Sequence, residues 1–98
     1  MADQYAAAPG VRMLDFGDEW IVFNPLSWDA HLLNAAAAVV LEQLSAQAQT
    51  ESEVADYLRD LVTDAERAHA LTYARRLIGE LMQLRLVRLV AADATHHR

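Results

Sequence analysis

Apolar and polar positions in the first third of the chain predict three short strands. Residues 11–16 and 20–23 are rich in β-branched and aromatic side chains, which favour extended backbone. Gly17-Asp18 between them is typical of a tight hairpin turn, because glycine tolerates the positive φ that such a turn needs. Asn24-Pro25 predicts a second turn, because proline disfavours helical backbone at the residue before it. Residues 30–33 then form the third strand.

Three helices follow in the predicted order of elements. Asn34 is a natural N-cap for residues 35–47, which are apolar almost all round and therefore predict a buried central helix. Thr50 and Thr63 each stand three residues before a glutamate, and this capping-box spacing starts a second and a third helix. The third helix is expected to run to about Leu84. Almost no chain separates the last two helices, which is the helix-turn-helix arrangement.

These elements predict an α+β domain of the winged helix-turn-helix-like class. An N-terminal three-stranded antiparallel sheet is followed by three helices and by a short closing strand over residues 86–90. We expect a flexible arm over residues 1–10, which are Ala-rich and end in Pro-Gly, and a flexible tail over residues 91–98. Residues 11–90 then form one domain, as a chain of 98 residues suggests.

The composition excludes several classes of protein. Hydrophobic residues make up 54% of the chain, which excludes a disordered chain. The sequence has no cysteine, so it forms neither disulfides nor thiol-based metal or catalytic sites, and this fits the reducing cytoplasm. Its longest apolar run, residues 35–41, falls short of the roughly 18 residues that a membrane span needs. We therefore expect a cytoplasmic protein without a membrane partner.

The charge of the chain argues against nucleic acid as its main partner. The net charge is −6, whereas non-specific binding to DNA depends on neutralised phosphates. All eight basic residues are arginine, a side chain suited to forked contacts with carboxylates. Arginines of the predicted third helix nevertheless keep a winged-helix DNA-binding regulator as an alternative. They are Arg67, Arg75, Arg76 and Arg85.

One segment, residues 20–34 (WIVFNPLSWDAHLLN), resembles a known family. It is similar to the PqqD-like domains, also called peptide recognition elements of ribosomal peptide maturation systems, and the closest similarity is to the branch called the HPr-rel-A system PqqD-family peptide chaperone. The shared pattern is an apolar strand, Asn-Pro-x-Ser, and His-Leu-Leu-Asn before an Ala-rich helix. Residues 81–87 (LMQLRLV) resemble the family's closing Leu-x-x-Leu-Gly-Leu-Ile motif. Three residues depart from the pattern: Trp28 replaces a glycine, Ala30 a threonine, and Arg85 a second glycine whose loss would lengthen the last helix.

The resemblance implies a non-catalytic chaperone that needs no cofactor. In such domains a precursor or leader peptide adds as an extra strand beside the third strand, rests against the third helix and is thereby recruited to a modifying enzyme. An edge strand can accept such a peptide because its N–H and C=O groups are unpaired. The candidate peptide-contacting residues are Trp28, Ala30, His31, Leu32, Leu33, His69, Tyr73, Arg76, Leu77 and Glu80. Those on the third helix fit an ordinary solvated helix face equally well.

Other residue groups resemble sites of catalysis or metal binding, and we expect neither activity. Ser27, Asp29 and His31 alternate on one strand, but a hydrolase triad converges from separate elements and needs an oxyanion hole. His31 either contacts a ligand or holds the turn by bonding to Ser27 or Asp29. The adjacent His96 and His97 have no carboxylate cluster to complete a metal site. A subunit that only scaffolds an enzyme complex is a further alternative, and the oligomeric state, a homodimer included, stays open.

Overall fold

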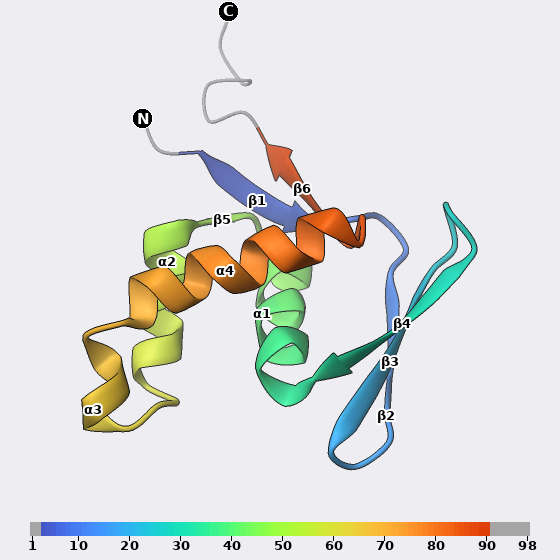
Figure 1. The fold of residues 1–98 in the computed structure, drawn as a ribbon. Helices are drawn as coiled ribbons and strands as arrows, with labels where there is room; N and C mark the ends of the chain where they lie inside the picture. The colour runs from blue at the N-terminus through green and yellow to red at the C-terminus, as the bar shows by residue number, and fades with distance from the viewer. Residues whose placement is uncertain (1–2, 91–98) are drawn as a thin grey trace, which may run out of the picture.

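The computed structural model describes residues 3–90, and their architecture is the predicted α+β class (Figure 1). The strands in the described part are β1 (Gln4–Ala7), β2 (Arg12–Asp15), β3 (Glu19–Asn24), β4 (Asp29–Asn34), β5 (Gln49–Thr50) and β6 (Val87–Val90). The helices are α1 (Ala35–Ala46), α2 (Glu51–Arg59), α3 (Asp64–Arg67) and α4 (Ala70–Gln83). The predicted tail lies outside the described residues.

The three strands predicted from the N-terminal pattern form one antiparallel sheet in the order β2-β3-β4. At the turn between β2 and β3, Gly17 has φ +84°, and the Phe16 N–H donates to the Glu19 carbonyl over 2.9 Å. The predicted Gly-Asp hairpin is therefore confirmed. β3 is the central strand, and its fully buried Val22 shows which face of the sheet packs on the helices.

A second sheet has the order β5-β1-β6, and the sequence did not predict two of its strands. β1 pairs antiparallel with β6 along its whole length, from Gln4 opposite Val90 to Ala7 opposite Val87. The prediction of a flexible arm is therefore wrong for the residues of β1. This segment is fixed by pairing with a strand at the far end of the chain, and the hydrophobic pattern of neighbouring residues does not predict such a distant partner.

Tyr5 of β1 packs against the hydrophobic core. Burial raises the pKa of its phenol, the carboxylates of Glu51 and Asp3 raise it further, and Arg75 lowers it. Because the folded chain favours the protonated phenol, this contribution to stability is fully present below a pH of about 10, the unfolded value. It is lost as the pH rises through the pKa of the folded state.

Helices α1 and α2 begin where their caps predict. The Asn34 side-chain oxygen accepts from the Ala37 N–H over 2.9 Å. Thr50 and Glu53 form the reciprocal capping box, with bonds of 3.1 and 2.8 Å. Each cap satisfies N–H groups that the first turn of a helix leaves unpaired.

The predicted third helix is interrupted, so its expected extent is wrong. α3 ends at Arg67, and α4 begins at Ala70 after a turn through Ala68 and His69. α3 buries no residue, whereas α4 buries five along one stripe. The break lets α4 take its own direction and lay this stripe against α1 and α2, a burial that α3 does not share.

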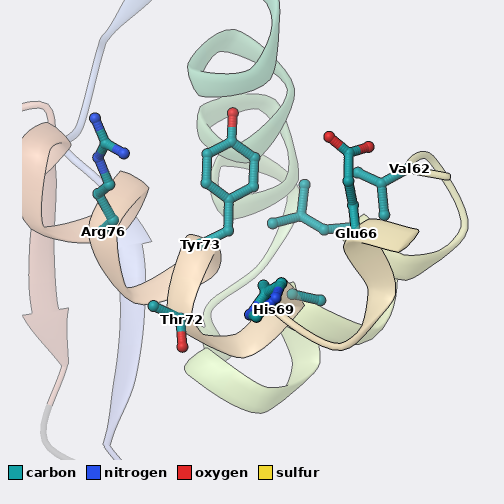
Figure 2. A pocket seen from close by; sticks show the side chains of 8 residues that line it. Val62, Glu66, His69, Thr72, Tyr73 and Arg76 are labelled. Carbon is teal, nitrogen blue, oxygen red and sulfur yellow. The ribbon is translucent and has the colours of Figure 1, made fainter. Parts of the chain in front are cut away.

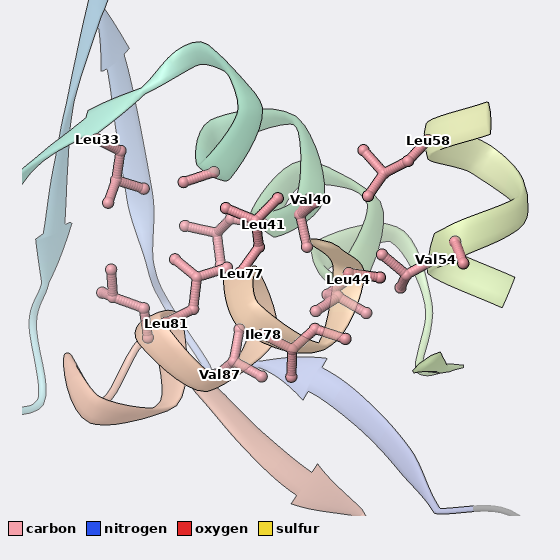
Figure 3. Close-up of a cluster of buried hydrophobic side chains, with 14 of the residues drawn as sticks. Leu33, Val40, Leu41, Leu44, Val54, Leu58, Leu77, Ile78, Leu81 and Val87 are labelled. Carbon is pink, nitrogen blue, oxygen red and sulfur yellow. The ribbon is translucent and has the colours of Figure 1, made fainter. Parts of the chain in front are cut away.

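The hydrophobic core lies where α1, α2 and α4 meet (Figure 3). Its largest fully buried side chains include Leu41 and Leu44 of α1 and Ile78 and Leu81 of α4. α1 buries two of its alanines together with Val40, Leu41 and Leu44, as its apolar sequence predicts. Burial of each such leucine or isoleucine contributes about 1.5–3 kcal/mol.

α4 ends in a Schellman turn at Arg85. The Arg85 N–H donates to the Met82 carbonyl and the Leu86 N–H to the Leu81 carbonyl, both over 3.0 Å, and these two bonds define the motif. Arg85 has φ +63°, a left-handed conformation that normally favours glycine. The expectation that this arginine lengthens the helix is therefore wrong. The turn is retained because it buries Leu86 beside Leu81 in the core.

Asn24 joins the β2-β3-β4 sheet to the end of α4. The residue is only 2% exposed. Its side-chain N–H donates to the Arg85 carbonyl over 2.9 Å, and its side-chain oxygen accepts from the Leu26 N–H over 2.9 Å. Its backbone carbonyl accepts from the Trp28 N–H over 2.8 Å. One residue thus closes the turn between β3 and β4 and fixes it to the turn after α4.

We expect Asn24→Ala to lower the free energy of unfolding by about 2 kcal/mol, because it removes a part-buried bond and leaves the Arg85 carbonyl without this donor. Asn24→Asp keeps the bond to Leu26 but loses the donor, and it should be as damaging. Urea denaturation followed by circular dichroism measures both. The control is Asn34→Ala, which removes an exposed N-cap and should cost about 1 kcal/mol. An Asn24→Ala variant that unfolds at the wild-type urea concentration would contradict the assignment.

We expect Arg85→Gly to raise the free energy of unfolding by about 1 kcal/mol, because glycine adopts φ +63° without steric cost. The Arg85 side chain is exposed, and little packing is lost. Thermal and urea denaturation measure the change. Arg88→Gly is the matched control, since Arg88 is an exposed residue of β6, and glycine there should destabilise. Equal destabilisation of both variants would show that the left-handed turn carries no strain.

Candidate functional site

β4 is an edge strand, since among the described residues it pairs with β3 alone. Bonds between antiparallel strands alternate along the ladder. Phe16 and Glu19 form a hydrogen-bonded pair at the end of the β2–β3 ladder. Starting from Glu19, alternate residues of β3 therefore form backbone hydrogen bonds with β2, and the residues between them form backbone hydrogen bonds with β4. Ala30 and Leu32 therefore direct their backbone N–H and C=O groups outward. These groups are the free edge of the sheet.

A groove of about 310 Å³ lies between the end of β4, the start of α1 and the C-terminal half of α4. Apolar side chains from all three elements form its floor, and the polar side chains of Asn34, Glu80 and Gln83 surround it. The full lining is Leu32, Leu33, Asn34, Ala37, Glu80, Leu81, Gln83 and Leu84. The groove thus runs beside the free edge.

Three of the predicted contact residues, Leu32, Leu33 and Glu80, meet at this groove. Ala30 lies on the same edge and is exposed, so its backbone is available even though it does not line the groove. His31 differs from the prediction, because it lies opposite Val22 and its side chain therefore points to the inner face of the sheet. Its backbone faces β3 rather than the edge.

Trp28 is the exposed aromatic residue that the sequence singled out. Its side chain is 79% exposed, and its ring meets the edge of the Phe23 ring, with centroids 5.9 Å apart. Its φ of +61° explains the family's glycine at this position, because a left-handed residue closes the turn between β3 and β4. Trp28 lies at the tip of this turn, at the opposite end of β4 from the groove.

His69, Tyr73 and Arg76 do not join the groove beside β4. They line a second pocket of about 340 Å³ between the N-terminal half of α4, α3 and the end of α2, together with Glu66 and Val62 (Figure 2). The expected stripe along α4 is therefore divided between two cavities. The Arg76 guanidinium contacts the Glu80 carboxylate over 3.4 Å, and this exposed ion pair lies between them.

Leu77 belongs to the core and lines neither cavity. It is 2% exposed and packs in the buried cluster, so the prediction that it meets a peptide is wrong. The sequence also missed five lining residues of the groove, namely Asn34, Ala37, Leu81, Gln83 and Leu84. Helical periodicity does not show that the last residues of α4 lie next to the start of α1, where they line the groove.

Ser27, Asp29 and His31 do not form a catalytic arrangement. The Ser27 hydroxyl and the His31 Nε2 are both buried without a hydrogen-bond partner, and no bond within the described residues joins the three side chains. Of the two roles open to His31, the bond to Ser27 or Asp29 is therefore not formed. No group of three or more His, Asp or Glu residues in the described part is placed to hold a metal ion. His96 and His97 lie outside that part.

The fold and the site define a small α+β domain in which an open sheet edge runs beside a groove on the last helix. The family model for Coenzyme PQQ synthesis protein D (PqqD) matches residues 19–87, and the chain belongs to this family. Its members are non-catalytic accessory proteins that bind peptides and modifying enzymes in ribosomal peptide maturation. No curated protein and no solved structure matches the chain. Within residues 3–90, no helix is both long and apolar enough to cross a bilayer.

Proposed function

We propose that this domain binds the leader segment of a precursor peptide as a fourth strand on β4 and delivers it to a modifying enzyme. The observation that carries the proposal is the free edge of β4, which lies directly beside an apolar groove on α4. Family membership supports the peptide as the ligand. The domain supplies binding and no chemistry.

Strand addition explains affinity through the backbone. The outward N–H and C=O groups of Ala30 and Leu32 gain partners from the added strand, and each such bond contributes about 1 kcal/mol. Successive side chains of an extended peptide point to opposite faces. Every second side chain of the peptide then turns toward the groove.

The groove explains selectivity through side chains. Its floor includes Leu33, Ala37 and Leu81, which fit an aliphatic side chain. Glu80 supplies a carboxylate at the rim, and its only ionic partner among the described residues is the exposed Arg76. We therefore expect a leader segment in which an aliphatic residue lies close to a basic residue.

The HPr-rel-A branch, with its HPr-kinase-like partner, and the cytoplasmic location remain part of this proposal. They depend on the resemblance of residues 20–34 and on the cysteine-free sequence. A gene neighbourhood that contains a short precursor, a modifying enzyme and an HPr-kinase-like protein would support the branch. A neighbourhood with none of them would remove it.

Two other functions fit the geometry less well. A DNA-binding regulator would need free cations on its last helices, but Arg67, Arg75 and Arg76 pair with Asp64, Glu51 and Glu80. Together with the net charge of −6, these pairs disfavour contact with phosphates. A scaffold subunit would bind the enzyme and leave the β4 edge unused. Peptide titration distinguishes it from the proposed function.

We expect Ala30→Pro to weaken binding of the neighbouring gene's precursor peptide about tenfold, because proline removes an outward N–H and blocks the approach of a strand. The fold should persist, since the Ala30 N–H does not bond to β3. Calorimetry measures the affinity. Backbone amide shifts on titration should centre on residues 30–33 and 80–84.

Ala30→Val is the matched control, because it keeps the N–H and favours extended backbone. His31→Pro is the second control and should disrupt folding, since its N–H faces β3. Equal affinity of the Ala30→Pro and Ala30→Val variants, or amide shifts confined to other residues, would disprove strand addition. Binding of the modifying enzyme without the peptide would favour the scaffold.

We further expect no retention on immobilised duplex DNA in low-salt buffer. The ion-paired arginines and the negative net charge leave few cations for phosphate contacts. If the protein is retained on the DNA and this retention weakens steeply with added salt, the result would support the DNA-binding alternative. A bovine serum albumin column in the same buffers serves as the control for non-specific adsorption.

A further inference from the structure

The outer face of the β2-β3-β4 sheet is apolar. Cross-strand register places Leu14, Ile21 and Leu32 in one row across all three strands, on the face opposite to the buried Val22. Rows above and below it add Phe16 and Phe23. The apolar side chains of this face are Leu14, Phe16, Ile21, Phe23, Ala30 and Leu32.

No described helix or strand covers this outer face, and the Trp28 ring contacts it only at Phe23. Leu14, Phe16 and Leu32 are 61%, 63% and 64% exposed. Figure 1 shows the sheet standing to one side of the helices, with β2, β3 and β4 extending away from α1. Neighbouring exposed apolar side chains of this kind mark an interaction surface rather than ordinary protein surface.

Two opposite charges lie at the two ends of the outer face. Arg12 shares its row with Phe23 and Ala30, and Glu19 shares its row with Asn34 at the other end. Both side chains are exposed, and neither forms an ion pair within the described residues. A partner that covers this face must therefore present an acidic group at one end and a basic group at the other.

We propose that this partner is a second copy of the chain, packed face to face with a two-fold axis along the row of Leu14, Ile21 and Leu32. Such an axis exchanges the two ends of the face. Arg12 of each copy then lies over Phe16 of the other copy, with Glu19 one strand away. Neighbouring strands are about 4.8 Å apart and stacked sheets about 10 Å apart, distances that an arginine side chain spans.

Charge selects this axis over the other two-fold arrangement. With a two-fold axis along β3, each end of the outer face would lie over the same end of the second copy. Glu19 would then lie against Glu19 of the second copy, and Arg12 would lie over its Ala30. Like charges in contact disfavour that arrangement. The chosen axis pairs Arg12 with Glu19 twice, because an isologous interface repeats each contact.

The dimer leaves the proposed peptide edge open. Its interface uses the outer face of the sheet, whereas the groove extends toward α4 and α1, and Leu32 is common to the interface row and the groove lining. The outward backbone groups of β4 lie in the plane of the sheet and remain free. Each dimer therefore carries two open peptide edges. The face covers three short strands, so we expect weak association, with a Kd of about 1–100 µM.

Sedimentation velocity on the full chain across a concentration series tests the dimer. Leu14→Glu should abolish association at the highest concentration. Leu61→Glu, at an apolar residue exposed elsewhere, should leave it unchanged. Arg12→Glu and Glu19→Arg should each weaken association about tenfold, and the double variant should restore it. Circular dichroism confirms that each variant folds.

Three results would overturn the proposal: a monomer at every concentration, association unaffected by Leu14→Glu, or a double charge swap without rescue. The last would indicate the rival axis or another face. Peptide affinity measured on the Leu14→Glu variant separates this inference from the proposed function, because it should equal that of the wild type. Loss of peptide binding with an intact dimer would refute the peptide site alone.

Discussion

The side-chain amide of Asn24 is the constraint on which the arrangement of the site depends. It is almost fully buried, and it donates to the carbonyl of Arg85 while accepting from the backbone of its own turn. A buried amide without these partners would be costly. The turn between β3 and β4 is thereby held against the turn after α4. The end of β4 and the C-terminal half of α4 line one groove.

Both non-glycine residues with left-handed backbone in the described chain lie on this network. Trp28 closes the turn that Asn24 begins, and Arg85 supplies the carbonyl that Asn24 binds. Left-handed backbone costs a non-glycine residue of order 1–3 kcal/mol. It persists only where other interactions of the folded chain hold the residue in that conformation. Here those interactions are the amide bonds of Asn24, the Schellman turn and the burial of Leu86. The same geometry explains why the family pattern has glycine at both positions.

Local features of the fold followed from the sequence, and non-local ones did not. The Gly17 hairpin and the caps at Asn34 and Thr50 depend on neighbouring residues, and all three form as predicted. β1 was missed because its partners, β5 and β6, are both distant in sequence. The third helix was expected to be continuous because its capping box is followed by good helix formers, and burial of the α4 stripe decides the break.

The candidate site was predictable along strands and less so along helices. The order of the strands and the family resemblance predicted residues 30–33 as an edge strand, and the sheet order agrees. On α4 the periodicity defined a stripe but not its neighbours, so His69 and Glu80 were grouped although they serve different cavities. Leu77 was listed among the peptide-contacting residues, although it is buried in the core. Only tertiary packing decides which turn of a helix faces which partner.

The pairing of β1 with β6 has a consequence for how this domain can be built into larger proteins. Gln4 lies opposite Val90, so the two ends of the described chain leave the fold side by side. Figure 1 shows that this corner is remote from the β2–β3 turn. A polypeptide that continues from Gln4 or Val90 would leave the described fold at that corner. The domain is thus geometrically suited to serve as an insert or an appendage, with the open edge of β4 away from both junctions.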